Sequence, residues 1–411
     1  MVSFLPLTSG VDAQAAQFSF SYMQFTNCGA TGANGPTLAN CLAQANYSSQ
    51  AWTSNTSFYN ISNGIQYWTV PTTGEYQISA AGAQGGGWGV NVGGKGVVET
   101  STVTLNEGEV LRIIVGQKGV TGSGNNGSGG GGTFVIRSPY DTNTAIIMIA
   151  GGGGGYGQAG GGTNMQGQTA RNPTSTNSNA GSNGGGGASA ANSSGGGNGF
   201  VAGANAPSSL WAAGGAGFGG NGGAYSTGGI AGPKSFLNGG TGGPGSPGAG
   251  GFGGGGGAGD RGAGGGGYSG GGGGNNTSSG GDGGGSYLTG TNQQAVGGAN
   301  SGDGYVVIAR YIPAIVSLSV PASATYRGAT TLTLNSDSPG KATFYANGKK
   351  ISGCISLLVS GSVGNYSVQC SWKPAIRGSA IVRATQIPSN GNLTVSTGNT
   401  TISIGNRTSN R

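Results

Sequence analysis

Runs of consecutive glycine limit what this chain can fold into more than any other feature of its sequence. Residues 151–300 contain 62 of the 98 glycines in the 411-residue chain, in runs such as 151–155, 184–187, 253–257 and 271–274. No Gly-X-Y register is sustained, so a collagen triple helix is not expected. A flexible linker and an ordered glycine-rich structure remain as alternatives.

The ordered alternative is a bundle of polyglycine helices of the polyproline-II type. Such helices have three residues per turn and no internal hydrogen bonds. Bare glycine backbones can approach each other closely, bond laterally and so satisfy their own polar groups. We expect this bundle over about 151–300, capped at its edges by the aromatic residues that punctuate the runs. These are Tyr156, Phe200, Trp211, Phe218, Tyr225, Phe252, Tyr268 and Tyr287.

Strand patterns frame the glycine-rich part, so we predict a mainly β fold. Residues 17–25 alternate aromatic and polar, which places Phe18, Phe20 and Tyr22 on one face of a strand. Residues 65–82 are expected to form two strands around a Pro-Thr-Thr-Gly turn, and residues 97–116 a hairpin that turns near Asn106-Glu107-Gly108. Further strands are expected at 133–137, 145–150 and 301–311.

The composition changes sharply after Pro313. Residues 314–411 contain only ten glycines and alternate in short runs, with a hairpin signal at Asn347-Gly348. The predicted strands are 315–320, 331–335, 342–351, 366–372, 380–387, 393–396 and 401–404. Seven short strands in about 100 residues are typical of an immunoglobulin-like β-sandwich. We therefore divide the chain into an arm (1–16), a glycine-rich domain (17–312) and an immunoglobulin-like domain (313–411).

The four cysteines form two local pairs, Cys28 with Cys41 and Cys354 with Cys370. Disulfides fit this pattern better than a metal site, because there is no second cluster of ligands. Loops of this size stabilise a fold by about 3 kcal/mol. Disulfides indicate an oxidising compartment, so we expect an extracellular, secreted or cell-surface protein.

The sequence gives no support for catalysis. It contains no histidine, the commonest general base. Glu107 and Glu109 are neighbouring acids, but a polar turn explains them better than a glycosidase pair. We expect no enzyme activity, no cofactor and no metal. No run reaches the roughly 18 apolar residues of a membrane span, so no membrane insertion is expected.

Positive charge is concentrated near the C-terminus. Residues 314–411 hold nine Lys or Arg residues and one acid, Asp337, whereas residues 1–313 hold eight basic and nine acidic residues. Solubility explains this asymmetry adequately. The functional alternative is attraction to an anionic glycan, a wall polymer or a neighbouring subunit; we expect no nucleic-acid partner.

Several motifs together resemble a known extracellular domain. They are the Cys28–Cys41 loop that begins CGATGANGPT, FSFS at 18–21, GIQYWTVPTTGEYQISAAGAQGG at 64–86 and GDGYVVIAR at 302–310. Over about 18–311 the chain resembles the glycine-rich domain of the leukocyte and anaplastic lymphoma receptor tyrosine kinases and of secreted microbial relatives. The resemblance implies a β-framework that carries polyglycine helices, and a binding or structural role.

A second resemblance covers about 314–405. The segments GKATFYANGKKISGC (340–354) and CSWKPAIRGSAIVRAT (370–385) are similar to immunoglobulin-like repeats of bacterial surface proteins. This resemblance implies a cell-surface protein of bacterial origin.

Polar and aromatic side chains suggest two kinds of sugar contact. N-x-S/T sequons, candidates for glycosylation, occur at Asn46, Asn55, Asn60, Asn126, Asn192, Asn275, Asn276, Asn365, Asn392, Asn399 and Asn406. Tryptophans such as Trp52, Trp68, Trp88 and Trp211 could stack on sugars, although packing in a core is the simpler interpretation.

These observations favour a structural or adhesive subunit of an extracellular filament. The apolar arm, with Val2, Phe4, Leu5 and Leu7, would add as a donor strand to a neighbouring copy and give head-to-tail assembly. The immunoglobulin-like domain is the expected acceptor, and residues 392–404 are the rival donor. The alternative function is an adhesin module, of phage-tip or bacterial surface type, that binds anionic or neutral surface glycans or a receptor.

Overall fold

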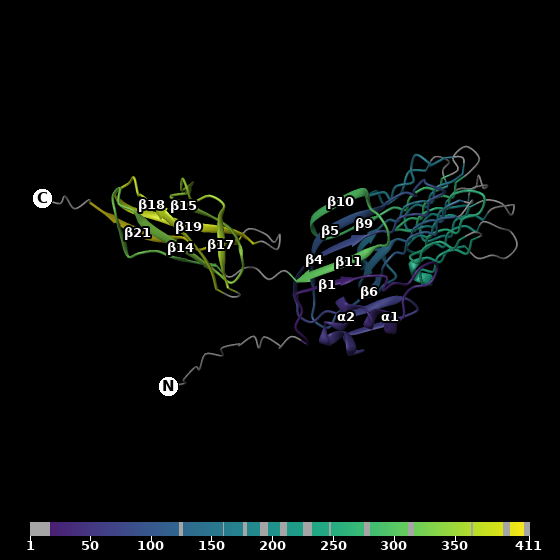
Figure 1. Cartoon of the computed structure of the whole chain (residues 1–411), viewed down its shortest axis with the longest axis horizontal. Coiled ribbons are helices and arrows are strands. Elements are labelled where there is room, and N and C mark those ends of the chain that lie inside the picture. The colour runs from purple at the N-terminus through teal and green to yellow at the C-terminus, as the bar shows by residue number, and fades with distance from the viewer. Residues whose placement is uncertain are drawn as a thin grey trace, which may run out of the picture. The chain divides into compact units, whose positions relative to one another are not determined.

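The computed structural model describes twelve stretches of the chain. They are residues 17–122, 126–158, 160–175, 179–189, 196–205, 212–224, 232–245, 248–274, 280–310, 316–362, 365–388 and 395–406. The fold is mainly β, as predicted, and divides into two compact units, Met1–Arg310 and Tyr311–Arg411 (Figure 1). The N-terminal arm, with Val2, Phe4, Leu5 and Leu7, lies outside the described residues.

Two antiparallel sheets form the framework of the first unit. One has the order β1 (Tyr22–Phe25), β11 (Tyr305–Arg310), β4 (Gly74–Ala81), β5 (Gly96–Leu105) and β10 (Thr291–Asn300). The other has the order β2 (Tyr59–Ser62), β3 (Ile65–Thr69), β6 (Val110–Ile114), β7 (Thr133–Ile136), β8 (Ile146–Ala150) and β9 (Tyr287–Leu288). The short helices are α1 (Leu38–Leu42), α2 (Ala45–Ser48), η1 (Ala51–Ser54), η2 (Asn143–Ala145) and η3 (Phe236–Asn238).

Two details of this framework differ from the sequence prediction. The segment 97–116 is not a hairpin, because β5 pairs with β4 and β10 whereas β6 pairs with β3 and β7 in the other sheet. The turn at 106–109 therefore connects two sheets. Phe20 is buried but Tyr22 is 52% exposed, because β1 begins only at Tyr22 and turns Met23 and Phe25 inward instead.

Glycine-rich segments continue outward from the strands as a bundle (Figure 1). Gly152 donates its N–H to the carbonyl of Gly266, and Gly155 donates to Ala263, each at 2.8 Å. A step of three residues in one segment thus matches a step of three in its antiparallel neighbour. This is the spacing of a polyproline-II-type helix, which brings every third residue back to the same side.

One run, residues 151–155, shows how completely the backbone is bonded. Its amide groups donate to Ser286 Oγ and to the carbonyls of Gly266, Ala83, Met165 and Ala263, and its carbonyls accept from Val97, Gly284, Gly130, Gly94 and Gly281. The partners belong to six different segments around the run. Lateral bonding therefore satisfies polar groups that a single helix would leave to water.

The bundle is built so closely that side chains are excluded from its interior. A Cβ atom on Gly153 would lie 1.8 Å from the carbonyl oxygen of Gly94. The bundle also extends beyond the predicted range, because segments 82–95 and 115–132 take part in it. Conversely, 287–288 and 291–300 are strands, which the sequence did not indicate.

Aromatic residues of the bundle form a core against the second sheet. Phe218, Phe252 and Tyr268 are at most 3% exposed and belong to one cluster with apolar residues of β6, β7 and β8. The ring of Phe236 stacks between those of Phe134 and Phe218, with centroid separations of 5.4 and 5.5 Å. Trp211 and Tyr225 lie outside the described residues.

The second unit is a β-structure of two ladders around one core. Its strands are β12 (Val316–Ser319), β13 (Ser323–Thr325), β14 (Thr330–Ser336), β15 (Gly340–Ala346), β16 (Lys349–Lys350), β17 (Leu357–Ser362), β18 (Asn365–Trp372), β19 (Gly378–Pro388), β20 (Val395–Ser396) and β21 (Thr400–Gly405). One ladder is β12-β14-β18-β17, and β17 continues it into β15-β19-β21-β13. Apolar residues of both ladders meet in a single cluster.

Candidate functional site

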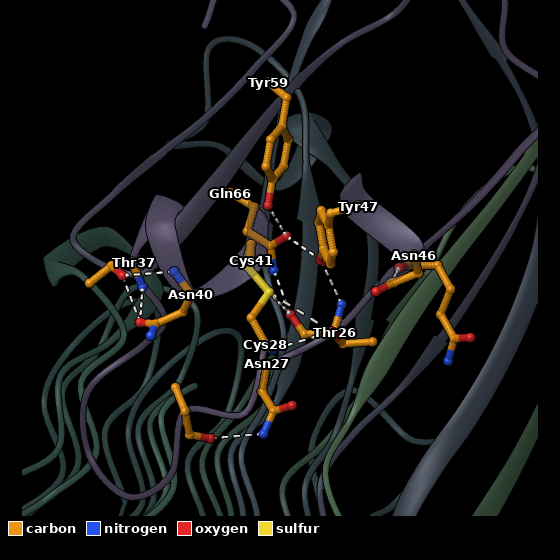
Figure 2. Close-up of a disulfide and its surroundings, with 12 residues drawn as sticks. Thr26, Asn27, Cys28, Thr37, Asn40, Cys41, Asn46, Tyr47, Tyr59 and Gln66 are labelled. Carbon is orange, nitrogen blue, oxygen red and sulfur yellow. Dashed lines mark hydrogen bonds between the residues drawn. A yellow bond between two sulfur atoms is a disulfide. The ribbon is translucent and has the colours of Figure 1, made fainter. Parts of the chain in front are cut away.

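Both predicted disulfides are present. Cys28 bonds to Cys41 with a Cα separation of 4.8 Å, and Cys354 bonds to Cys370 with a Cα separation of 5.4 Å. The first fastens α1 to the segment that follows β1 (Figure 2). Thr37 caps this helix, since its hydroxyl accepts from the amide of Asn40 while the Asn40 side chain accepts from the Thr37 amide.

A buried polar cluster lies next to the first disulfide (Figure 2). The hydroxyls of Tyr47 and Tyr59 both donate to Oε1 of Gln66 at 2.8 Å, and Nε2 of Gln66 donates to the carbonyl of Thr26. Burial raises the pKa of both tyrosines above its ordinary value, so they stay neutral hydrogen-bond donors. This cluster positions the disulfide loop and holds no group poised for chemistry.

The second disulfide lies beside a cleft of about 640 Å³ in the second unit, which we call the lysine-rimmed cleft. It is lined by Ala346, Asn347, Lys349, Lys350, Ile351, Ser352, Ser371, Trp372, Lys373, Ala375 and Ile376. Ile351 and Trp372 are 7% and 8% exposed, whereas Ile376 is 37% exposed. An exposed apolar group beside a buried apolar floor is typical of a binding site.

Local sequence explains how the cleft is built. Asn347 and Gly348 adopt positive φ angles of 47° and 79°, which makes the tight turn between β15 and β16 that the sequence predicted. The turn places Lys349 and Lys350 at the rim. Cys370 precedes Trp372 by two residues on β18, so the bond to Cys354 holds the two walls of the cleft together.

The charged residues that line the cleft are all positive. Lys349, Lys350 and Lys373 are exposed at its rim, and no acidic residue lines it. The one acid of residues 314–411, Asp337, bonds with Ser338 instead. The cleft can therefore accept apolar side chains on its floor and anionic groups at its rim.

The sequons are mostly exposed. Among the described residues, Asn46, Asn55, Asn60, Asn365, Asn399 and Asn406 are exposed. The prediction of a glycosylation site at Asn126 is wrong. This residue is 3% exposed and its side-chain amide donates to the carbonyl of Gly259, which leaves no room for a glycan in the folded chain. Asn192, Asn275, Asn276 and Asn392 lie outside the described residues.

The remaining candidates have structural surroundings. Trp52 and Trp68 are 5% and 0% exposed in the core of the first unit, so they are not available to stack on a sugar. Glu109 forms a salt bridge with Arg137 at 2.7 Å and accepts from the amide of Asn106. The carboxylate of Glu109 therefore bonds both to the turn and to Arg137 after β7, in agreement with the simpler interpretation of a polar turn.

The cleft itself was not found from the sequence. Its walls, 346–352 and 371–376, are about twenty residues apart, and the pairing of Cys354 with Cys370 was the signal that they meet. The Lys349-Lys350 pair directly after the Asn-Gly turn was a second sequence feature that pointed to this site.

Comparison with known proteins finds similarity over part of the chain. The leukocyte tyrosine kinase receptor of Mus musculus is 35% identical over 102 residues, which is 23% of this chain and 11% of the receptor. The resemblance predicted from the motifs is thus supported for a limited stretch. No protein-family model matches the chain. The immunoglobulin-like assignment of the second unit stays a prediction.

Disulfides in both units and partial similarity to a receptor are compatible with an extracellular or secreted protein. Among the helices that the structure describes, none is long and apolar enough to cross a membrane.

Proposed function

We propose that this protein is a structural subunit of an extracellular filament, with the glycine bundle as its rigid body and the lysine-rimmed cleft as its acceptor site. The observation that carries the proposal is the cleft. Its apolar floor is formed by Ile351 and Trp372, and the described side chains of the fold do not cover this floor completely.

The occupant of the cleft in this proposal is the N-terminal arm of a neighbouring copy. The arm carries Phe4, Leu5 and Leu7, and burying such side chains is worth about 1.5–3 kcal/mol each. Asp12, the acid that follows in the same segment, matches the positive rim in charge. A contact between the arm of one copy and the second unit of the next is head-to-tail, and such a contact generates a filament when the rotation between copies does not close a ring.

The rival donor, residues 392–404, is a weaker candidate. Its described part is already paired within its own unit: β20 pairs with β19, and β21 pairs with both β19 and β13. Donating this segment would break those ladders. We therefore assign the donor role to residues 2–8, whose Phe4, Leu5 and Leu7 supply apolar side chains.

The proposal is tested by imaging the purified chain, a variant lacking residues 2–8, and Ile376→Asp. Ile376 is exposed at the cleft, so Asp is tolerated by the fold but places a charge where the arm would bind. Ile355→Asp is the matched control, since Ile355 is also exposed but does not line the cleft. We expect filaments from the parent and the control only. Filaments of undiminished length from the deletion and from Ile376→Asp would refute the proposal.

Binding of a surface glycan is the second candidate function. It is favoured by a separate polar cavity in the glycine-rich unit, where a buried carboxyl group lacks a hydrogen-bond partner for one oxygen among the described residues. An adhesin of this kind would not require filament formation.

A further inference from the structure

A polar cavity of about 370 Å³ lies where β5 and β10 meet a segment of the bundle. It is lined by Glu99, Thr169, Arg171, Ser286, Leu288, Gln293, Gln294 and Ala295. Most of these side chains carry a hydrogen-bonding group, and they come from four separate parts of the chain. Convergence of polar groups from distant segments on one cavity is a feature of ligand sites.

Glu99 is the unusual member of this set. Its side chain is 1% exposed on β5, and among the described residues its Oε2 atom has no hydrogen-bond partner. Burial raises the pKa of Glu99 to about 8, so at neutral pH the group is a carboxylic acid that can donate one hydrogen bond. Leaving such a buried polar atom unpaired is costly, and a ligand that bonds to it would remove that cost.

Arg171 supplies the charge of the cavity. Its guanidinium lies 3.9 Å from the centroid of the Tyr287 ring, and no described carboxylate pairs with it. The strands packed against Glu99 add no further charge nearby: β8 and β10 have no charged residue, and Glu75, the charged residue of β4, lies opposite Thr104 at the far end of β5. With Glu99 neutral, the cavity has a net positive charge.

We propose that this cavity binds an acidic saccharide, a pyranose unit that bears a carboxylate. The sugar carboxylate pairs with Arg171, whose planar guanidinium matches it with two parallel hydrogen bonds. The sugar hydroxyls bond to the amides of Gln293 and Gln294 and to Glu99. This inference deepens the glycan-binding candidate and is independent of whether the chain forms filaments.

The test is a titration of the full chain with galacturonate and, as the neutral match, galactose, followed by NMR or calorimetry at pH 6.5. We expect galacturonate to bind about tenfold more tightly than galactose, because a hydrogen bond to a charged group contributes more than one between neutral groups. Arg171→Gln removes this preference, whereas Lys118→Gln, a change at an exposed lysine outside the cavity, preserves it.

A second measurement uses Glu99→Gln, which keeps a neutral donor at this position at every pH. Raising the pH from 6.5 to 9 ionises Glu99 in the parent, so galacturonate affinity falls about tenfold, whereas it stays constant in Glu99→Gln. Thermal unfolding checks that each variant is folded. Equal binding of the two sugars, no binding of either, or a preference that persists in Arg171→Gln would overturn the inference, and none of these outcomes depends on filaments.

Discussion

The amide of Gly153 donates to the carbonyl of Ala83 at 2.9 Å, and this bond joins two segments that leave different sheets. Ala83 follows β4, and Gly153 follows β8. The strands of the framework thus continue directly into the glycine helices. The bundle is not an insertion attached to a separate β-domain, because its innermost helices are extensions of the sheets themselves.

Close packing at this position predicts a large cost for one added methyl group. We expect Gly153→Ala to destabilise the first unit by about 3 kcal/mol, because its Cβ would lie 1.8 Å from the carbonyl oxygen of Gly94, which already accepts a hydrogen bond from the amide of Gly85. Gly74→Ala is the control, since its nearest neighbour is the Arg310 side chain at 3.8 Å. Urea unfolding measures both, and equal midpoints would contradict this view of the bundle.

The cluster around Gln66 predicts an asymmetric response to substitution. Gln66→Leu leaves the buried hydroxyls of Tyr47 and Tyr59 without their shared acceptor and should cost about 3 kcal/mol. Tyr59→Phe removes one donor and leaves Gln66 bonded to Tyr47, so about 1 kcal/mol is expected. Chemical unfolding that gave Tyr59→Phe the larger loss would show that Gln66 does not organise this cluster.

Stability of the first unit should fall as the pH rises. The folded pKa of Glu99 is raised from 4.5 to about 8 by burial, so between these values the folded state holds a proton that the unfolded state has released. The free energy of unfolding therefore decreases with pH, by up to about 1.4 kcal/mol per unit across this window. Glu99→Gln should remove this contribution, which thermal melts between pH 5 and 9 can measure. A parent and variant with parallel pH profiles would contradict the assignment.

The Cys354–Cys370 bond should stabilise the second unit alone. Replacing both cysteines by alanine is expected to lower its free energy of unfolding by about 3 kcal/mol, as a loop of this length predicts. The first unit has its own core and its own disulfide, so its transition should not move. Calorimetry of the full chain separates the two transitions, and a shift in both would mean that the units are coupled.

The glycine runs and the alternating strands were sufficient to predict the bundle and the β-framework, because both depend on local composition and periodicity. Which strands pair with one another was harder to predict from the sequence. The turn at Asn106-Glu107-Gly108 looked like a hairpin, but sheet membership is decided by long-range partners of β5 and β6. β10 was missed because its sequence, TNQQAVGGAN, has no alternation and its residues are largely exposed.

The binding sites were harder to predict for the same physical reason. The Glu99 cavity joins segments that are far apart in the sequence, and the lysine-rimmed cleft joins two segments about twenty residues apart. A carboxyl group in the alternating strand 97–105 is unremarkable in the sequence, and only the folded structure shows that Glu99 is buried. Only the cysteine pairing could have indicated that the two walls of the cleft meet.

Helical reconstruction of the native assembly by electron cryomicroscopy tests the central claim most directly. The proposed filament predicts continuous density for residues 2–8 of one copy in the cleft between Ile351 and Trp372 of the next, with Phe4, Leu5 or Leu7 on the cleft floor. An empty cleft in an ordered filament, or a chain that stays as discrete particles at every concentration, would contradict the proposal.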